Sequence, residues 1–218
     1  MTPIAVKNYP LPPVDVQEVL RYATCREAQE DVVALAQWAV EETAPILQGR
    51  VCWRAAEVQV CGDTVHLGSA VWTSHKLAQR LIGCEKVVLF AATVGLELDR
   101  LIVRYGHLSP AKGLMLQALG AERVEALCDT FNEEIKAQYG STQPRFSPGY
   151  GDLPLTAQRE LFSMLECPKR IGLFLNESLL MSPTKSVTAI IGIGGEACAA
   201  AGCKACGKRD CTFRRDRT

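Results

Sequence analysis

The chain has 218 residues, which is long enough to bury a substantial core as one domain or slightly more. Its 24 Lys and Arg residues balance its 24 Asp and Glu residues, so no overall field attracts nucleic acid or an acidic membrane surface. No apolar run reaches the length of a membrane span, and the first residues lack the apolar core of a signal peptide. We therefore expect a cytoplasmic globular protein with neither nucleic acid nor membrane as a partner.

The first third of the chain predicts two helices followed by a β-hairpin. Prolines at positions 10, 12 and 13 keep the start extended. The pattern Thr24-Cys25-Arg26-Glu27 is a capping box and predicts a helix start. The elements expected here are a helix over 14–23, a helix from 24 to about 45, and strands over 50–61 and 64–72 joined by a turn at Gly62-Asp63.

The rest of the chain alternates helical patterns with apolar runs. The run over 86–93 is continuously apolar and predicts a central buried strand. The expected elements are helices over 74–82, 96–105, 110–139 and 155–165, a short apolar run over 171–175, a helix running into a turn over 176–183, and a last strand over 186–193. Because no strict βαβ repeat is present, we predict an α+β fold with a mostly antiparallel sheet packed against helices.

The predicted helix over 110–139 carries two stripes. The apolar stripe is expected to face the core and consists of Leu114, Ala118, Ala121, Val124, Leu127, Phe131 and Ile135. The acidic stripe beside it consists of Glu122, Glu125, Asp129 and Glu133. Such a stripe is commonly a solvated face, but Glu125 lies close to the core stripe in angle. It could therefore face an amine-bearing ligand held by the following loop.

That loop, Arg145-Phe146-Ser147-Pro148-Gly149-Tyr150 and its continuation to Pro154, contains an unusual set of groups. Pro148 followed by Gly149 predicts a type II turn. Arg145 offers a planar cation that can hold a carboxylate through two hydrogen bonds, and Tyr150 offers a flat ring. Two interpretations are open: a site for a ligand with a carboxylate and a flat ring, or a tight connection whose Arg caps a helix and whose Tyr fills the core.

No self-contained catalytic motif is present. The sequence lacks both a phosphate-binding P-loop and a complete Gly-x-Gly-x-x-Gly pattern after a strand. Its three histidines, His66, His75 and His107, have no neighbouring nucleophile with which they would form a catalytic pair. We therefore expect that the chain catalyses nothing alone.

From about residue 114 to residue 193, the chain resembles the activation domain of cobalamin-dependent methionine synthase. The resemblance rests on the spacing of several segments over about eighty residues. These segments are Leu114-Met115-Leu116-Gln117-Ala118-Leu119, Glu125-Ala126, Arg145 to Tyr150 as Arg-x-x-x-Gly-Tyr, Ile171-Gly172, Asn176-Glu177-Ser178, Met181, Pro183 and Ser186-Val187.

The resemblance implies a twisted antiparallel sheet and S-adenosylmethionine bound near the corrinoid of a partner. In that reaction inactive cob(II)alamin takes up one electron and is remethylated from S-adenosylmethionine. The implied ligand contacts are Arg145 to the methionine carboxylate, Glu125 to the ammonium, the Ser147 backbone to the adenine, and Gly149 and Tyr150 in the loop against the ligand. Since no corrinoid, folate or homocysteine module is evident, we expect a separate cobalamin-binding methionine synthase or other corrinoid protein as the partner.

A cysteine-rich tail, residues 195–218, follows the domain expected over 1–194. Its cysteines, Cys198, Cys203, Cys206 and Cys211, lie within fourteen residues, a spacing that predicts one metal centre. The pattern leaves three readings open: structural zinc, an iron–sulfur cluster, or free thiols. An iron–sulfur cluster could relay an electron to the corrinoid from a donor such as ferredoxin or flavodoxin.

Two functions are compatible with the sequence. The first is an accessory component that binds S-adenosylmethionine and reactivates a corrinoid protein. The second is an adaptor that docks a corrinoid protein or its reductase without using the methyl donor. Arg145 and Glu125 favour the first function.

Overall fold

The computed structural model describes residues 1–25 and 29–195. Its centre is an antiparallel sheet of four strands in the order β1-β2-β6-β9. The strands are β1 (Ala5–Tyr9), β2 (Gly49–Glu57), β6 (Cys84–Thr93) and β9 (Ser186–Gly194). The α+β class and the antiparallel sheet predicted from the sequence are confirmed.

The continuous apolar run of β6 is explained by burial on both faces of this sheet. Side chains alternate along a strand, so successive residues enter opposite cores. Val88, Phe90 and Ala92 enter one core, and Val87, Leu89 and Ala91 enter the other. All six side chains are fully buried. The strand therefore separates two hydrophobic cores, and helices cover both faces.

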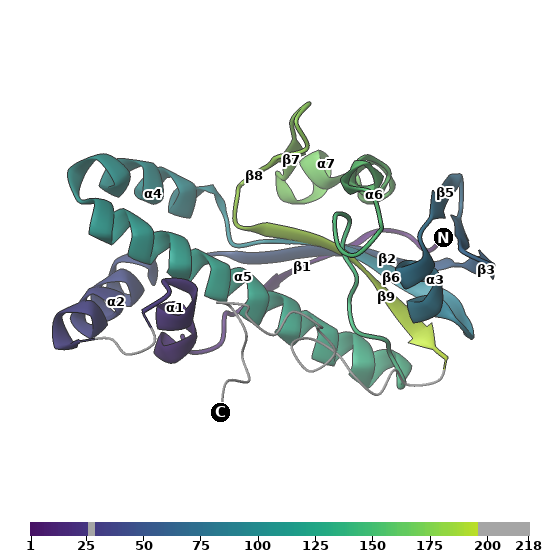
Figure 1. The fold of residues 1–218 in the computed structure, drawn as a ribbon, viewed down its shortest axis with the longest axis horizontal. Coiled ribbons are helices and arrows are strands. Elements are labelled where there is room, and N and C mark those ends of the chain that lie inside the picture. Colours follow the sequence, from purple (N-terminus) through teal and green to yellow (C-terminus); the bar gives the residue numbers. More distant parts are fainter. Residues whose placement is uncertain (26–28, 196–218) are drawn as a thin grey trace.

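Four helices pack on the first face. They are α1 (Val16–Tyr22), α2 (Glu30–Thr43), α4 (Leu96–Leu108) and α5 (Pro110–Tyr139). The longest, α5, runs diagonally across the sheet in Figure 1, with α1 and α2 beside it. Its residue Phe131 packs at the centre of this core, where its ring contacts Phe90 and Trp53.

The second face is covered by shorter elements. A small sheet with the order β3-β4-β5 lies at one end of the molecule, and α6 and α7 lie above the central strands in Figure 1. These elements are β3 (Gln59–Cys61), β4 (Thr64–Leu67), β5 (Ala70–Thr73), α3 (His75–Leu81), a 3₁₀ turn (Leu155–Ala157), α6 (Gln158–Leu165), α7 (Cys167–Ile171), β7 (Phe174–Leu175) and β8 (Met181–Ser182).

Several predicted boundaries were wrong, each for a local reason. Helix α2 begins at Glu30 after Gln29, so the capping box at Thr24 does not start it. Thr24 has a φ of 62°, outside the helical region, and ends the turn that follows α1. Helix α4 continues past Gly106 to Leu108, and Gly106 lies where α4 and α5 approach closely. A Cβ added at Gly113 would stand 3.0 Å from the Gly106 Cα.

The two strands predicted for the hairpin form four strands, one in the central sheet and three in the small sheet. The expected strand over 50–61 divides at Val58 into β2, in the central sheet, and β3, in the small sheet. The expected strand over 64–72 likewise divides at Gly68, which has a φ of 58°, into β4 and β5. The turn at Gly62-Asp63 joins β3 to β4 as predicted.

Two other predictions need correction. The segment 176–183 is not a helix: it forms the turn and second strand of the β7–β8 hairpin, in which the Asn176 side chain accepts a hydrogen bond from the Leu180 N–H. Leu114 is 57% exposed and does not belong to the α5 core stripe.

The four tail cysteines, Cys198, Cys203, Cys206 and Cys211, lie outside the described residues. Within the described ranges, no helix is long and apolar enough to cross a membrane.

Candidate functional site

The loop after α5 is held along the free edge of β9. The Gln143 N–H donates to the Gly192 carbonyl at 2.8 Å, and Phe146 and Ile190 exchange two backbone hydrogen bonds at 2.9 Å. The Phe146 side chain is 3% exposed and anchors the loop in the second core. Arg145, between these contacts, is thereby held beside α5.

The predicted type II turn is present. The Tyr150 N–H donates to the Ser147 carbonyl at 3.1 Å across Pro148 and Gly149. Gly149 has a φ of 81°, which only glycine adopts at little cost. The turn leaves the Tyr150 ring 59% exposed, with its edge against Phe146 at a centroid distance of 5.6 Å. Tyr150 therefore presents a ring at the surface and does not fill the core.

Arg145 reaches back to α5 and contacts two of its carboxylates. Its Nη1 donates to Asp129 Oδ1 at 2.6 Å, and its Nη2 forms a shorter contact with Glu125 Oε2. Glu125 and Asp129 are four residues apart, so they project from the same face of the helix. With its amide turned to suit both neighbours, Asn132 also places its oxygen 2.6 Å from Nη1. We call Arg145, Glu125 and Asp129 the Arg145 cluster.

The Arg145 cluster is partly shielded from water. The side chains of Arg145, Glu125 and Asp129 are 21%, 34% and 54% exposed. Burial by itself lowers the pKa of Arg145, but Cys128 and the two carboxylates outweigh it and raise that pKa. Burial also raises the pKa of the Cys128 thiol, so at neutral pH the negative charge lies on the carboxylates. The cluster then carries one net negative charge.

The cluster lines a cavity of about 530 Å³, a size typical of small-molecule sites. Four of the residues predicted from sequence meet there: Glu125, Arg145, Ser147 and Tyr150. Gly149 shapes the turn behind them. The remaining lining residues are Arg80, Asp129, Asn132, Pro144 and Phe146. A second cavity, of about 590 Å³, shares Glu125 and Asp129, so the two cavities meet at these carboxylates.

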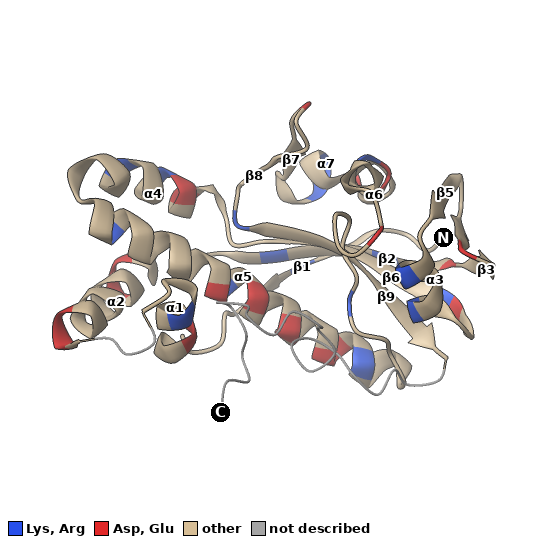
Figure 2. Ribbon diagram, in the orientation of Figure 1, with Lys and Arg blue, Asp and Glu red and all other residues tan. Residues whose placement is uncertain are grey.

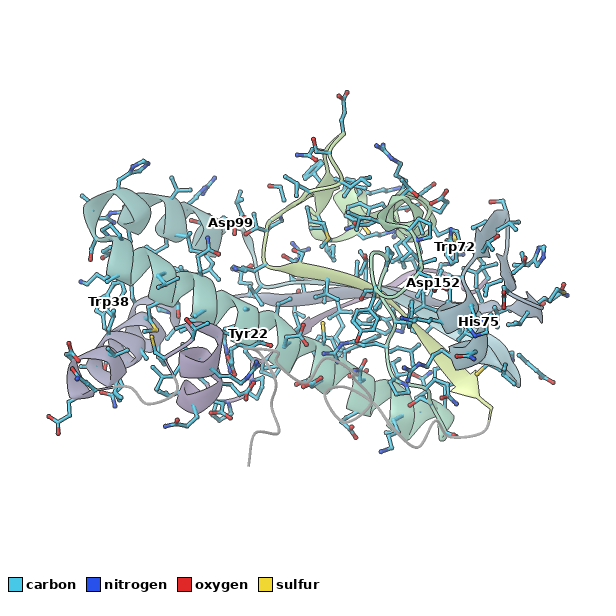
Figure 3. All side chains as sticks on the ribbon, in the orientation of Figure 1. Tyr22, Trp38, Trp72, His75, Asp99 and Asp152 are labelled. Carbon is cyan, nitrogen blue, oxygen red and sulfur yellow. The ribbon has the colours of Figure 1, made fainter. Side chains whose placement is uncertain are left out.

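The other wall of the cavity involves α3, which the loop itself fixes in place. The Asp152 carboxylate accepts hydrogen bonds from the Ser74 hydroxyl and from the His75 N–H, the latter at 2.9 Å. The Ser74 hydroxyl and the N–H groups of Lys76 and His75 lower the pKa of Asp152. Figure 3 shows Asp152 and His75 side by side. The loop therefore connects the end of α5 to the start of α3.

The acidic stripe of α5 divides into two environments. Figure 2 shows acidic positions repeated along this helix. Glu125 and Asp129 belong to the cavity, whereas Glu122 is 5% exposed and pairs with the buried Arg123. The Arg123 Nη atoms also donate to the carbonyls of Pro12 and Pro13. The expectation that such a stripe is a solvated face therefore does not hold for Glu122.

Sequence reasoning missed Arg80 and Asn132 as lining residues. Asn132 lies seven residues after Glu125 on the same helix face, and this spacing was a usable signal. Arg80 carried no local signal, because it enters the cavity from a helix more than sixty residues earlier in the chain. Within residues 1–25 and 29–195, no group of His, Cys, Asp and Glu side chains is arranged to hold a metal ion.

Known proteins give two findings. The family model of the vitamin B12-dependent methionine synthase activation domain matches residues 77–201. The crystal structure of the MetH reactivation domain bound to AdoHcy is similar, with a TM-score of 0.67 and 16% identity over 91% of this chain and 81% of that chain. At that identity the likeness establishes the fold. No curated protein sequence matches the chain significantly.

Proposed function

The chain belongs to the activation-domain family of vitamin B12-dependent methionine synthases, and we propose that it binds S-adenosylmethionine and supports reductive remethylation of cob(II)alamin on a separate corrinoid protein. In this reaction the corrinoid substrate takes up one electron and then receives the methyl group of S-adenosylmethionine. The product released from the methyl donor is S-adenosylhomocysteine. Family membership supports the reactivation role. The cavity at the Arg145 cluster supports the choice of methyl donor.

The observation that carries this proposal is the arrangement of charges in the Arg145 cluster. S-adenosylmethionine has a sulfonium, an ammonium and a carboxylate, and thus one net positive charge. The Arg145 cluster combines one guanidinium with two carboxylates and is complementary to it. A partly shielded site strengthens such charge-assisted contacts relative to water.

The proposed roles follow from what each group presents. Glu125 receives the ammonium, and Arg145 orients Glu125 while offering its remaining N–H groups to the carboxylate. The exposed Tyr150 ring packs on the ligand or on the corrin. The Ser147 backbone bonds the adenine, and Gly149 lets the loop approach closely.

The chain is proposed to act only together with partners. These are a cobalamin-binding methionine synthase or another corrinoid protein, and an electron donor such as ferredoxin or flavodoxin. The chain by itself is expected to turn nothing over, because the corrinoid and the electron both come from partners.

Reactivation can be tested directly. The chain is mixed with cob(II)alamin-loaded methionine synthase lacking its own activation domain, a reductant and S-adenosylmethionine. The expected result is a return of the methylcobalamin absorbance at a rate that rises with the chain concentration. Equal rates with and without the chain contradict the reactivation role. Binding to the corrinoid protein without any binding of S-adenosylmethionine instead supports the adaptor.

For the tail we propose one metal centre held by Cys198, Cys203, Cys206 and Cys211, with iron–sulfur preferred over zinc. The reason is chemical: the reaction consumes one electron, which an iron–sulfur cluster can relay and zinc cannot. Anaerobic purification followed by metal analysis separates the cases. Brown protein with iron and labile sulfide supports the relay, and colourless protein with one zinc indicates a structural site. Protein without either metal contradicts the centre, and Cys203→Ser is expected to remove whichever metal is present.

A further inference from the structure

Arg80 lines the 530 Å³ cavity, although no sequence pattern indicated it. Its positive charge is not paired with the carboxylates of the Arg145 cluster. Arg80 lies in the last turn of α3 (His75–Leu81), the helix whose first turn is bonded to Asp152. The α3 helix and the loop that carries Arg145 are thus joined into one wall. Arg80 and Arg145 line the same space from separate elements.

The Arg80 guanidinium has an unmet hydrogen-bonding requirement. Its Nη1 atom is buried and has no hydrogen-bond partner in the described part of the chain. No carboxylate among the described residues forms an ion pair with Arg80, so the positive charge of this half-buried side chain stays unneutralised beside the cavity. By contrast, Arg123 on α5 and Arg145 in the following loop each contact at least one carboxylate.

The Arg145 cluster alone is a poor site for a carboxylate. Two carboxylates already neutralise Arg145, and they would repel a third at close range. An amino acid end group carries both charges, so its ammonium suits Glu125 and Asp129 while its carboxylate needs a further cation. Anions with two or more charges and no ammonium, such as phosphates, are disfavoured by the same two carboxylates.

Building on the proposed function, we propose that Arg80 binds the carboxylate of the amino acid end of S-adenosylmethionine. The ammonium then lies toward Glu125 and Asp129, and the carboxylate lies between Arg80 and the free N–H groups of Arg145. In this arrangement Arg145 chiefly positions the acidic groups, and Arg80 supplies the positive charge that is not already neutralised.

The test uses two ligands that differ only in the carboxylate. S-adenosylmethionine and decarboxylated S-adenosylmethionine are titrated calorimetrically into wild type, Arg80→Ala and Arg80→Gln. Arg80→Ala is expected to weaken S-adenosylmethionine about ten- to a hundredfold, the loss typical of a charge-assisted contact. Its affinity for the decarboxylated ligand should stay within about twofold of wild type. Arg80→Gln should behave alike, with a smaller loss.

Two control variants isolate the effect. Gln79→Ala changes the neighbouring exposed residue of α3, and Arg104→Ala removes an exposed arginine of α4 that does not line the cavity. Both should bind both ligands as wild type does.

The failures are distinguishable. If wild type does not bind S-adenosylmethionine at all, the proposed function is wrong. If wild type binds and Arg80→Ala binds equally well, only the role of Arg80 is wrong. Equal losses for both ligands, or loss of the folded state in both Arg80 variants by circular dichroism, would make Arg80 a structural residue and also contradict the proposal.

Discussion

Helix α5 supplies the carboxylates of two arginine–carboxylate groups that are similar in chemistry and different in surroundings. Arg123 and Glu122 have side chains only 2% and 6% exposed, and they fasten the N-terminal segment through the carbonyls of Pro12 and Pro13. The Arg145 cluster lies on a cavity, and its two carboxylates are 34% and 54% exposed. The first group connects parts of the fold, whereas the second remains open to a ligand.

Solvent access, and not residue type, is the difference on which the proposed ligand-binding role of the Arg145 cluster rests. A fully buried pair cannot exchange partners without opening the core, and removing one member leaves an uncompensated charge. A partly exposed pair contributes little to stability, and its groups can turn to a ligand. The contrast leads to different expectations for variants of the two groups.

The largest effect is expected for Arg123→Met. The substitution leaves the Glu122 carboxylate buried without its cation and should lower the free energy of unfolding by about 3–5 kcal/mol, measured by urea denaturation. Adding Glu122→Leu should recover part of this loss, because the unpaired charge is removed. The carbonyls of Pro12 and Pro13 would still lack their donor. A loss below about 1 kcal/mol in the single variant would contradict the structural role.

Glu125→Gln should change ligand affinity more than stability, the opposite of Arg123→Met. The free energy of unfolding is expected to change by less than about 1 kcal/mol, because the pair is partly exposed and Arg145 keeps Asp129. Affinity for S-adenosylmethionine should fall about tenfold through the lost charge opposite the ammonium, equivalent to about 1.4 kcal/mol. Glu133→Gln, on the same helix but outside the 530 Å³ cavity, is the matched control. A large stability loss with unchanged affinity would reverse the comparison.

A smaller effect is expected from pH through Asp152, which ties the cavity loop to α3. Its hydrogen bonds, first that from Ser74, lower its pKa from the ordinary value of 3.8 in the folded state. The carboxylate therefore stabilises the fold above about pH 3.8, and this contribution is lost as the pH falls through the lowered pKa. Thermal unfolding of wild type and Asp152→Asn should differ at neutral pH and converge in acid. A difference that persists unchanged at low pH would contradict this role.

The sequence predicted the fold class and most of the site because these depend on local patterns. The apolar run of β6 and the stripes of α5 have clear periods, and Pro148-Gly149 determines its own turn. Glu125, Arg145, Ser147 and Tyr150 do line one cavity. Their proximity could be predicted from the sequence because the helix that carries Glu125 leads directly into the loop that carries the other three.

The remaining features depend on contacts between distant segments. Nothing local separates Glu122 from Glu125, since burial of Glu122 follows from the docking of Pro12 and Pro13 more than a hundred residues earlier. Arg80 enters the cavity from α3, which is positioned by its bond to Asp152 and by its packing in the second core. The strand over 50–61 divides at Val58 because its two halves pair with different sheets, a choice that periodicity cannot indicate.

Calorimetric titration of S-adenosylmethionine into wild type, Arg145→Ala and Arg104→Ala tests the central claim, that the Arg145 cluster is a ligand site and not a structural ion pair. We expect binding to wild type and Arg104→Ala, and a ten- to a hundredfold weaker affinity for Arg145→Ala, about 1.5–3 kcal/mol. Arg145→Ala should stay folded, with less than about 1 kcal/mol lost in unfolding free energy. No heat from wild type at millimolar ligand, or equal affinity in all three proteins, would contradict the claim.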